Sequence, residues 1–574
     1  MNSTLRSWSI KSPPRSACLD QSRIQLLARR LEISPLLVRL LLLRGQATEA
    51  DMDKFLSPGL RHLLPLDKWP NVMAGAQLLA ATIAAGHSIA VWGDYDVDGI
   101  TATALVTDFL RRREVDVVHF IPDRRAFGYG LHSQGIQNLA AQGVRLLLTV
   151  DCGIANIEEV REAKRLGLRV IITDHHLPGQ GVPDADVLIN PKLGGWPSEN
   201  LAGVGVSFLL MGALNRVLPG PPLDIRDYLD LVALGTIADV VPLDEQNRIL
   251  VKNGLLLIKE GLRPGIQALK EISGLSQGDA IGAGTIAFAL APRINAAGRI
   301  GDPDLAVQLL LEQNPDTAKI IATQLDKLNT KRKTEEQRIL EEAIAQAESQ
   351  LVRPGLVLHS EHWHPGIIGI VASRIVERFQ RPCLILTKEN GIFKGSGRST
   401  PDFDLYAALV ACKQCLHKFG GHRQAAGLKL EPFQLASLKD LFSQAVVDQL
   451  GNNPPQPMLE LDMELPFSQI SDTLLKELEL LQPFGHGNPR PIFLSPALSV
   501  RKHRFFGQKK HLELHLVDTS DGIVHRAVAW RQGEQWQNHA LDGKEAVVAY
   551  TPRLSKYNGL QQFELAVQDI LSIR

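Results

Sequence analysis

Residues 91–99 read Val-Trp-Gly-Asp-Tyr-Asp-Val-Asp-Gly and place three carboxylates, Asp94, Asp96 and Asp98, at alternate positions. They follow a short apolar run, residues 88–92, and precede a helix-like segment, residues 101–112. Alternate side chains of an extended segment point the same way, so we expect the carboxylates to share one face. Like charges on one face repel each other, and a bound cation relieves that repulsion. The carboxyl end of a strand is also where open α/β sheets bind ligands.

Two further apolar runs end in polar residues. Residues 145–150 (RLLLTV) lead into Asp151, and residues 169–173 (RVIIT) lead into Asp174, His175 and His176. Helical patterns at residues 133–142 and 156–166 separate these runs. Alternating strands and helices predict an α/β fold with a doubly wound parallel sheet, whose strand ends meet along one edge. Asp239 follows the apolar, helix-like residues 228–234 and is a further candidate for this edge.

Carboxylates and imidazoles without a nearby cysteine set favour Mn²⁺ or Mg²⁺ over a structural zinc ion. A carboxylate that bridged two cations about 4 Å apart would form a two-metal hydrolytic centre. A single Asp-x-Asp is more often an acidic surface turn, and a single histidine is more often a core residue. These carboxylates and histidines lie at several separate strand ends, which favours a metal site over both alternatives.

The composition limits the class of protein. A chain of 574 residues is too long for one core and predicts three or four domains. The 62 basic and 62 acidic residues balance, so net charge argues neither for nor against a nucleic-acid partner. Five scattered cysteines indicate a reducing, cytoplasmic setting. The first 16 residues lack the apolar core of a signal peptide, and the apolar residues 36–43 are too few to span a membrane.

Changes in pattern along the chain predict five parts. Residues 316–350 are polar and lack glycine and proline, which predicts a long connecting helix. Pro454 and Pro455 mark a linker, and short runs of alternating polarity after it predict a small β-barrel. The expected parts are a helical region (1–65), an α/β domain (66–315), the connecting helix (316–350), a second α/β domain (351–453) and the barrel (456–574).

The motifs GDYDVDG, VDCG, DHH and GTIADV, in this order, resemble those of the DHH phosphoesterases. Residues 291–300 (APRINAAGRI), 364–375 (HPGIIGIVASRI), 420–427 (GGHRQAAG) and 483–489 (PFGHGNP) resemble one branch of them, the bacterial single-strand-specific exonucleases. The resemblance runs from about Pro65 to the end of the chain. Several relatives have a histidine two residues before the first aspartate, where this chain has Trp92, so the resemblance carries no ligand over to that position.

This resemblance implies a DHHA1-type second domain and an OB-fold barrel. It also implies an Mn²⁺- or Mg²⁺-dependent exonuclease that degrades single-stranded DNA from the 5′ end to mononucleotides in recombination and repair. One cation would be held by Asp98, Asp151, His175 and Asp239. A second would be held by Asp96 and Asp151, with or without Asp94. His176 would contact the phosphate or the leaving oxygen, and Asp174 would orient a neighbouring histidine.

Two segments are candidates for phosphate contacts. Residues 394–399 (KGSGRS) combine glycines with Arg398, which suits an anion, although a plain hairpin turn is the alternative. By resemblance, Ser396 and Arg398 hold the terminal 5′ phosphate together with Arg124, for which Arg125 is an alternative, and His422 belongs to the same DNA-binding set. A loop of small residues is expected to present the groups that grip the scissile phosphate, Arg293, Asn295 and Arg299.

Residues 501–511 (RKHRFFGQKKH) are basic, contain no acid and include the pair Phe505-Phe506. Cations that follow phosphates beside rings that stack on bases are typical of single-strand binding. A solvated hairpin with one core phenylalanine is the alternative. The expected cationic contacts are Arg501, Lys502, Arg504, Lys509 and Lys510.

The expected partners are single-stranded DNA and, by resemblance, a single-strand DNA-binding protein and a RecQ-type helicase. We expect a monomer without membrane contact. Two rival functions remain open. A DHH phosphoesterase of short oligonucleotides or cyclic dinucleotides would share the metal ligands, but such enzymes are typically shorter and lack the basic barrel. A non-catalytic replication scaffold would have lost metal ligands that this chain keeps.

Overall fold

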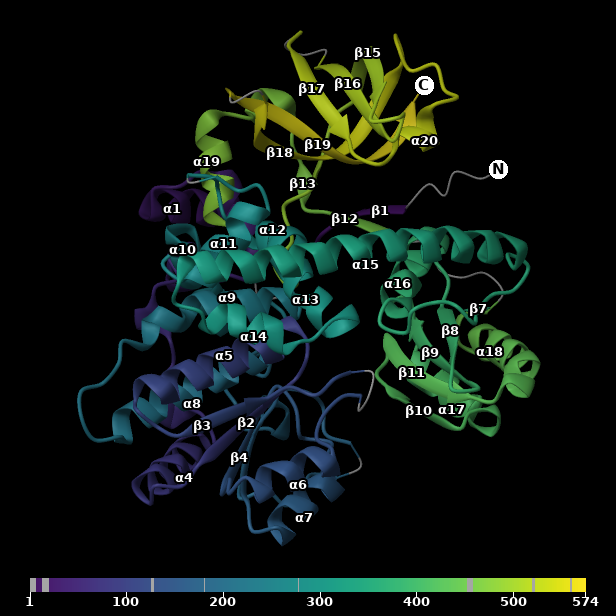
Figure 1. Ribbon diagram of the computed structural model, residues 1–574. Coiled ribbons are helices and arrows are strands. Elements are labelled where there is room, and N and C mark those ends of the chain that lie inside the picture. The colour runs from purple at the N-terminus through teal and green to yellow at the C-terminus, as the bar shows by residue number, and fades with distance from the viewer. Residues whose placement is uncertain are drawn as a thin grey trace.

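The computed structural model describes residues 7–12, 20–124, 128–179, 181–276, 278–451, 458–518, 522–557 and 560–573. Figure 1 shows an α/β body, a second and smaller α/β body, a helix that reaches from one to the other, and a β-rich body above them. Arg125 and the Pro454-Pro455 linker lie outside the described residues. Among the described residues, no helix combines the length and the apolar character needed to cross a membrane.

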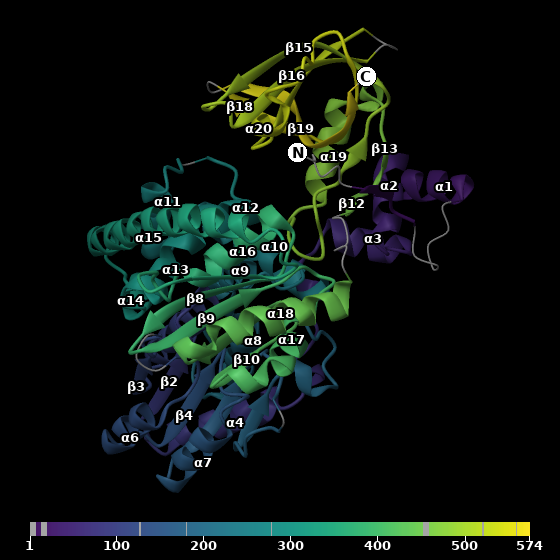
Figure 2. The same ribbon diagram turned by 90° about the vertical axis from the view of Figure 1, so that its right-hand side faces the viewer.

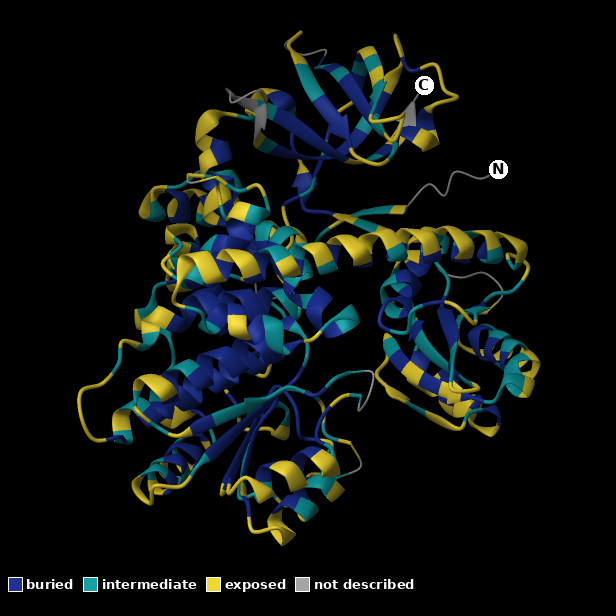
Figure 3. Cartoon of the chain, viewed as in Figure 1, coloured by how far each residue is buried: buried dark blue, intermediate teal, exposed yellow. Residues whose placement is uncertain are grey.

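The first α/β body contains a five-stranded sheet in the order β3-β2-β4-β5-β6, with every pair parallel. All residues of β2 and β4 are buried, as expected for parallel strands that are covered on both faces (Figure 3). The doubly wound fold predicted from the sequence is confirmed. The strands are β2 (Ile89–Gly93), β3 (Val117–Phe120), β4 (Leu146–Val150), β5 (Arg169–Thr173) and β6 (Val187–Ile189).

Helices cover both faces of this sheet. One face packs with α4 (Val72–Ala84), α5 (Val97–Arg112) and α8 (Gly203–Val217) in the largest apolar core. The other face packs with α6 (Ser133–Ala141) and α7 (Ile157–Arg165) in a separate core. The chain runs from β2 to β3 on one side of β2 and then returns to form β4 on the other side. The strand order therefore reverses at β2. Ligands of open α/β sheets bind at this point.

The start of α5 corrects one expectation. The helix begins at Val97 rather than near residue 101, and Asp96 caps it by accepting hydrogen bonds from the backbone N–H groups of Asp98 (2.9 Å) and Gly99 (3.1 Å). Asp94, Asp96 and Asp98 therefore do not alternate along an extended segment. Aspartate is favoured at an N-cap and in the first turn, where its charge meets the positive end of the helix.

The helices that follow β6 complete this body and carry the second correction. Residues 291–300 were expected to form a loop, but they form α13 (Ala291–Ile300), which a π-helical turn (Ile286–Leu290) precedes. Alanine favours a helix, and Pro292 lies in the first turn, where a proline does not interrupt the hydrogen bonds. The other helices are α9 (Leu229–Ala238), α10 (Glu245–Glu260), α11 (Pro264–Ile272), α12 (Ala283–Thr285) and α14 (Asp304–Leu311).

A single long helix, α15 (Pro315–Ser349), joins the two α/β bodies. Asn314 caps its start by accepting from the N–H groups of Asp316 (2.9 Å) and Thr317 (3.1 Å). The first half of α15 packs on α11, α13 and α14, and the second half packs on α16 (Ile368–Phe379) of the next body (Figure 1). The helix therefore spans both bodies and sets their separation.

The second α/β body has a mixed five-stranded sheet in the order β10-β11-β9-β8-β7. The glycine-containing residues 394–399, for which a hairpin turn was the alternative, belong almost entirely to the central strand β9. Ser396 and Arg398 therefore lie on one face of the sheet. The strands are β7 (Leu356–Ser360), β8 (Cys383–Glu389), β9 (Ile392–Arg398), β10 (Lys418–Gly421) and β11 (Ala425–Leu430), with helices α17 (Leu405–Ala411) and α18 (Leu435–Leu450).

The C-terminal strands close into a ring through the pairs β15–β16, β16–β17, β17–β19, β19–β18 and β18–β15, in which only β17 and β19 are parallel. A closed five-stranded ring of this kind is an OB-fold, as predicted. The strands are β15 (Leu498–Phe506), β16 (His511–Asp518), β17 (Val524–Ala529), β18 (Glu545–Tyr557) and β19 (Leu560–Ile573).

The N-terminal region packs on the C-terminal unit. Helices α1 (Gln21–Leu31), α2 (Pro35–Leu43) and α3 (Glu49–Leu56) share one apolar core with α19 (Asp472–Leu480) and the barrel (Figure 2). Strand β1 (Ser7–Ile10) pairs in parallel with β12 (Met458–Leu461). The described part of residues 1–65 therefore contains a strand as well as helices, and β1 and α1–α3 pack with the last part of the chain.

Candidate metal centre and nucleic-acid cleft

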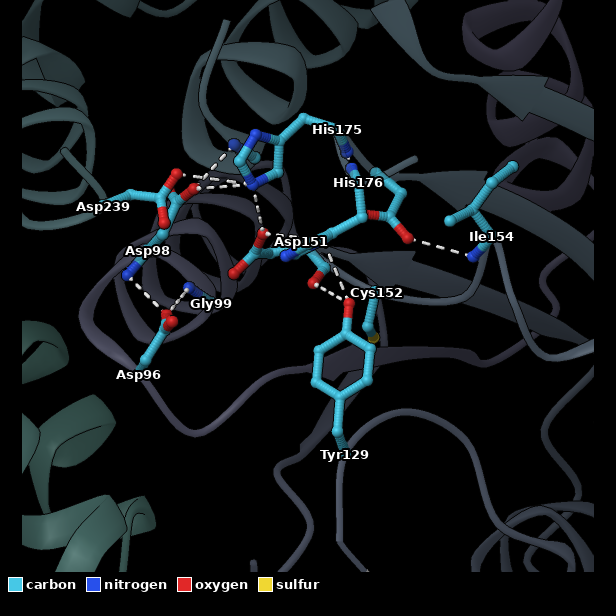
Figure 4. Close-up of polar contacts among 12 residues, drawn as sticks. Asp96, Asp98, Gly99, Tyr129, Asp151, Cys152, Ile154, His175, His176 and Asp239 are labelled. Carbon is cyan, nitrogen blue, oxygen red and sulfur yellow. Dashed lines mark hydrogen bonds and ion pairs between the residues drawn. The ribbon is translucent and has the colours of Figure 1, made fainter. Parts of the chain in front are cut away.

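The carboxyl ends of β2, β4 and β5 bring the predicted acidic and histidine residues together, as Figure 4 shows. Asp94 follows β2, Asp151 follows β4, and Asp174, His175 and His176 follow β5. Asp239 arrives from the C-terminal end of α9. Three overlapping groups have ligand atoms within 4.8 Å of one another: Asp94, Asp96 and Asp151; Asp98, His175 and Asp239; Asp151, His175 and His176.

His175 is the centre of one group. Its Nε2 atom lies 3.2 Å from Asp151 Oδ1, 3.5 Å from Asp239 Oδ2 and 3.8 Å from Asp98 Oδ2. Within the described residues, this nitrogen and Asp151 Oδ1 are buried and make no hydrogen bond. Burial and then the neighbouring His176 lower the pKa of His175 to about 3, so its imidazole is neutral and free to donate a lone pair.

The carboxylates are crowded as well as buried. Burial, and then the charge of Asp96, raise the pKa of Asp98 to about 7, and burial followed by the charge of Asp98 raises the pKa of Asp239 to about 8. The pKa values of Asp94 and Asp151 are raised well above the ordinary range for the same reasons. Desolvated like charges of this kind fit cations, which would return all of the carboxyls to the ionised form.

Backbone groups hold Asp98 in place. Its two oxygens accept hydrogen bonds from the N–H groups of Gly203 (2.7 Å) and Val204 (2.8 Å) at the start of α8. A Cβ atom on Gly203 would lie 2.6 Å from Asp151 Oδ1, so only glycine allows α8 to approach this closely. Gly203 was not predicted as a site residue, although the run Gly-Val-Gly-Val at 203–206 is unusual for a helix start.

Asp174 lies outside the three groups and orients His176 instead. Its Oδ1 accepts hydrogen bonds from His176 Nδ1 (2.8 Å) and from the N–H groups of His175 (2.8 Å) and His176 (3.1 Å). Its Oδ2 accepts from the N–H of Ile154 (2.9 Å). Burial lowers the pKa of His176, but the bond and charge of Asp174 outweigh this and raise it to about 9. His176 is therefore protonated at neutral pH.

Tyr129 is a site residue that the sequence analysis missed. Its hydroxyl lies 3.0 Å from His176 Nδ1 and donates to the Asp151 carbonyl at 3.2 Å (Figure 4). Tyr129 lies five residues after Arg124, and this closeness to a candidate phosphate contact could have identified it from the sequence. Trp92, which occupies the position of a histidine in several relatives, is fully buried between Phe120 and His132. Trp92 is therefore a core residue on the far side of β2.

A cleft of about 580 Å³ separates the two α/β bodies and is lined by Arg124, Ser396 and Arg398 together with backbone of residues 420–421. Arg398 Nη1 donates to Ser396 Oγ (3.1 Å), and Arg299 Nη1 crosses between the bodies to the Gly366 carbonyl (3.3 Å). Burial and then Arg124 lower the pKa of Arg299 to about 10 and also lower the pKa of Arg398. Within the described residues these arginines have no salt bridge, so the cleft is suited to an anion.

The remaining expected contacts are placed differently. His422 lies at the surface of the second body, and its partial burial, followed by the charge of His176, lowers its pKa. Asn295 lines a separate cavity of about 400 Å³ beside Val240. Arg293 is not brought to the site. It pairs with Asp326 of α15 (2.9 Å) and donates to the Ala289 carbonyl (2.6 Å), because six residues of helix turn it about 120° from Arg299.

The basic stretch of the barrel forms a hairpin, β15 and β16, in which the two phenylalanines differ. Phe505 packs against the core that the barrel shares with α1–α3. Phe506 lies 5.6 Å from Trp530 and 5.0 Å from His511, which makes a partly exposed ring cluster that includes a tryptophan the sequence analysis missed. Arg504 is paired with Glu513 (3.2 Å). The cations that remain exposed and have no salt bridge within the described residues are Arg501, Lys502, Lys509 and Lys510.

Comparisons with known proteins agree with this architecture. Residues 88–236 match the DHH family N-terminal domain, residues 353–448 match the DHHA1 domain, and residues 461–569 match the RecJ OB domain. The single-stranded-DNA-specific exonuclease RecJ of Salmonella typhimurium is 36% identical over 564 residues, which cover 94% of this chain and 96% of that protein. The RecJ protein of Bacillus subtilis is 34% identical, over 98% of this chain and 70% of its own length.

Solved structures give the same assignment. A crystal structure of RecJ in complex with Mn²⁺ from Thermus thermophilus matches 99% of this chain and 80% of its own, with a TM-score of 0.84 at 32% identity. A second structure of that protein, in complex with Mg²⁺, matches with a TM-score of 0.79. From the order of its motifs, its three matched domains and these full-length similarities, the chain belongs to the RecJ family of single-stranded-DNA-specific exonucleases.

Proposed function

We propose that this chain is a metal-dependent exonuclease that degrades single-stranded DNA from the 5′ end and releases mononucleotides. The observation that carries the proposal is the adjacency of two features. A buried cluster of carboxylates and imidazoles needs cations, and beside it lies a cleft between the two bodies, with Arg124 on one side and Arg398 on the other. A phosphodiester that met both would have its scissile phosphate at the cluster and its terminal phosphate at the arginines.

The donor set fits Mn²⁺ or Mg²⁺, since carboxylate oxygens dominate it and only one neutral imidazole joins them. Asp98, Asp151, His175 and Asp239 would hold one cation, and Asp94, Asp96 and Asp151 a second. When bound, such cations lower the pKa of a water molecule and neutralise charge on the phosphate oxygens.

The protein's own groups supply the rest of the chemistry. His176 is oriented by Asp174 and Tyr129 and is protonated at neutral pH, so it can donate a hydrogen bond to a phosphate oxygen or a proton to the leaving oxygen. Arg299 carries a buried guanidinium that feels the charges of Arg124 and Asp96 and can stabilise charge on the phosphate. We assign the terminal 5′ phosphate to Arg124, Ser396 and Arg398, which line the cleft, and propose His422 of the adjoining residues 420–427 as a further DNA contact.

The barrel would hold the strand that follows the reacting end. Its ring cluster, Phe506 with Trp530, suits stacked bases, and the unpaired cations of the hairpin suit phosphates. The rival function as a phosphoesterase of small substrates gives this hairpin no role. The rival function as a non-catalytic scaffold gives no role to the complete set of candidate metal ligands.

One assay tests the proposal. A single strand of about 30 nucleotides carries a label at either the 5′ or the 3′ end and is incubated with chelator-treated protein and added Mn²⁺ or Mg²⁺. Early release of a labelled mononucleotide from the 5′-labelled strand only, and none without a cation, is expected. Release from the 3′ label first would reverse the polarity, and cleavage of dinucleotides alone would favour the small-substrate function.

By family resemblance we also infer a role in DNA recombination and repair in the cytoplasm, alongside a single-strand DNA-binding protein and a RecQ-type helicase, with the chain acting as a monomer. The described cysteines, Cys152, Cys383, Cys412 and Cys415, are free and buried, which suits a reducing compartment. Light scattering on the full chain and pull-down with each purified partner test these inferences separately.

A further inference from the structure

The turn that carries Asp239 has an unusual backbone. Asp239 caps the C-terminal end of α9, and the next residue, Val240, has a φ of 61°, a left-handed conformation that β-branched residues rarely adopt. The Val240 side chain is 63% exposed, so its own packing does not hold this conformation. Such a conformation persists only where surrounding contacts impose it.

A loop from the C-terminal unit supplies those contacts. His486 Nδ1 lies 3.0 Å from the Val240 carbonyl, and because a carbonyl only accepts, the proton must lie on Nδ1. The His486 carbonyl in turn accepts from the N–H of Leu243 at 2.8 Å. One residue therefore holds the segment after Asp239 at both ends, although it lies more than 200 positions away in the sequence.

The loop that carries His486, residues 482–489, is braced from within. Asn488 is 2% exposed, and its Nδ2 donates to the carbonyls of Leu481 and Pro483, both at 2.8 Å. Arg248 of α10 donates to the Gln482 carbonyl at 2.8 Å. A Cβ atom on Gly485 would lie 2.8 Å from Leu243 Cδ1, so glycine permits the close approach. The loop is thus a preformed part that the Asp239 turn packs against.

Asp239 depends on this support more than its neighbours do. Its side chain is 23% exposed, whereas those of Asp98 and Asp151 are 0% and 1% exposed. Backbone N–H groups fix the Asp98 carboxylate, but within the described residues no hydrogen bond fixes the carboxylate of Asp239. The backbone conformation at 239–240 therefore decides where this carboxylate points.

We propose that His486 is a positioning residue for Asp239, through which the C-terminal unit sets the affinity of the metal centre. This inference rests on the metal centre of the proposed function. The C-terminal unit then does more than bind DNA. Its loop 482–489 contributes no metal ligand but positions one that belongs to the first α/β body. Only the group Asp98, His175 and Asp239 should respond, because Asp239 is absent from the group Asp94, Asp96 and Asp151.

The test measures Mn²⁺ binding by the chelator-treated full chain without DNA, from the electron paramagnetic resonance signal of free Mn²⁺. In His486→Ala, one class of bound ion should weaken about three- to tenfold, the range expected from one lost hydrogen bond, while the other class is retained. His486→Asn, which can still present an N–H to the carbonyl, should bind within about twofold of the unsubstituted chain. His539→Ala, an exposed histidine of the same unit, is the matched control.

A double-variant cycle gives the sharpest outcome. In an Asp239→Asn background, His486→Ala should cause no further loss, because both act through the same carboxylate. Equal Mn²⁺ binding by His486→Ala and the unsubstituted chain, or full additivity with Asp239→Asn, would overturn the inference. If His486→Ala does not fold, His486→Leu and His486→Asn make the same comparison, since leucine fills the space but cannot donate. No Mn²⁺ binding by the unsubstituted chain would reject the metal centre itself and the inference with it.

Discussion

Asp174 and His176 share two hydrogen bonds, with Asp174 Oδ1 2.8 Å from His176 Nδ1 and 3.1 Å from the His176 backbone nitrogen. The same carboxylate also anchors the backbone at Ile154, so it ties the end of β5 to the segment after β4. The pair fixes both the direction and the charge of an imidazole that faces the reacting phosphate in the proposed function.

Asp174→Asn should therefore slow turnover about 10–100-fold, the usual cost of losing a group that orients a site residue. The amide removes the charge that raises the pKa of His176 and one of the acceptor oxygens, so His176 loses its proton nearer neutral pH. Steady-state rates on a 5′-phosphorylated strand, beside DNA affinity, provide the measurement. Asp184→Asn, at an exposed salt bridge with Lys164, is the matched control. Unchanged turnover in Asp174→Asn would remove His176 from the chemistry.

Asp98→Ala and Asp151→Ala should each reduce cleavage by several orders of magnitude, because each removes an anion that the ligand groups need. Affinity for single-stranded DNA should change little, since it rests on basic groups of the barrel and the cleft. Rates with added Mn²⁺ and fluorescence anisotropy of a labelled strand separate the two effects. Nearly full activity of Asp151→Ala in Mn²⁺ would contradict the shared-ligand arrangement.

The metal-free protein should become less stable as the pH rises. The folded chain raises the pKa of Asp98 to about 7 and that of Asp239 to about 8, from an ordinary value of 3.8. Between these values the folded state binds protons that the unfolded state releases, so the free energy of unfolding falls as pH rises through this window. Calorimetry in chelator at pH about 5 and about 8 measures the fall.

Added Mn²⁺ should raise the melting temperature more at the higher pH, because ionised carboxyls bind cations and protonated ones do not. The double variant Asp98→Asn, Asp239→Asn is the control and should lose most of both effects. A larger Mn²⁺-induced increase at pH about 5 than at pH about 8 would contradict the raised pKa values.

Arg398→Ala should reduce the preference for a 5′-phosphorylated end over a 5′-hydroxyl end, by roughly 10–100-fold if the guanidinium makes a charge-assisted bond. Arg293→Ala is the matched arginine control. Its pairing with Asp326 and Ala289 predicts a lower melting temperature with the end preference intact. The ratio of initial rates on the two ends is the readout. An unchanged ratio in Arg398→Ala would move the terminal phosphate elsewhere.

The two phenylalanines of the barrel hairpin should separate binding from folding. Phe506→Ala and Trp530→Ala should each weaken binding of a long single strand by about 1–3 kcal/mol, since their rings are partly exposed and adjacent. Phe505→Ala should instead lower the free energy of unfolding by up to about 3 kcal/mol, because Phe505 packs on the shared core. Binding isotherms and thermal melts distinguish the outcomes. Weak binding by Phe505→Ala with an unchanged melt would reverse the assignment.

The sequence by itself determined the parallel sheet and the residues at its edge. The mostly apolar run 169–173 coincides with β5, and the run 145–150 contains all of β4, because a strand buried on both faces is largely apolar along its length. Since parallel strands end along one edge, the residues after β4 and β5 had to meet those after β2. The long polar segment likewise became α15, as its lack of glycine and proline required.

Other features were decided only by the tertiary structure. Asp98 receives its hydrogen bonds from the start of α8, more than 100 residues away, and nothing in its own motif identifies that partner. Because residues 291–300 form a helix, Arg293 points toward α15 and Arg299 toward the site. A predicted loop could not distinguish these two directions. The N-terminal helices joined the barrel, and loop 482–489 reached the Asp239 turn. Local pattern sets which elements form, but the partners of a side chain depend on how distant elements pack, which no short window of sequence contains.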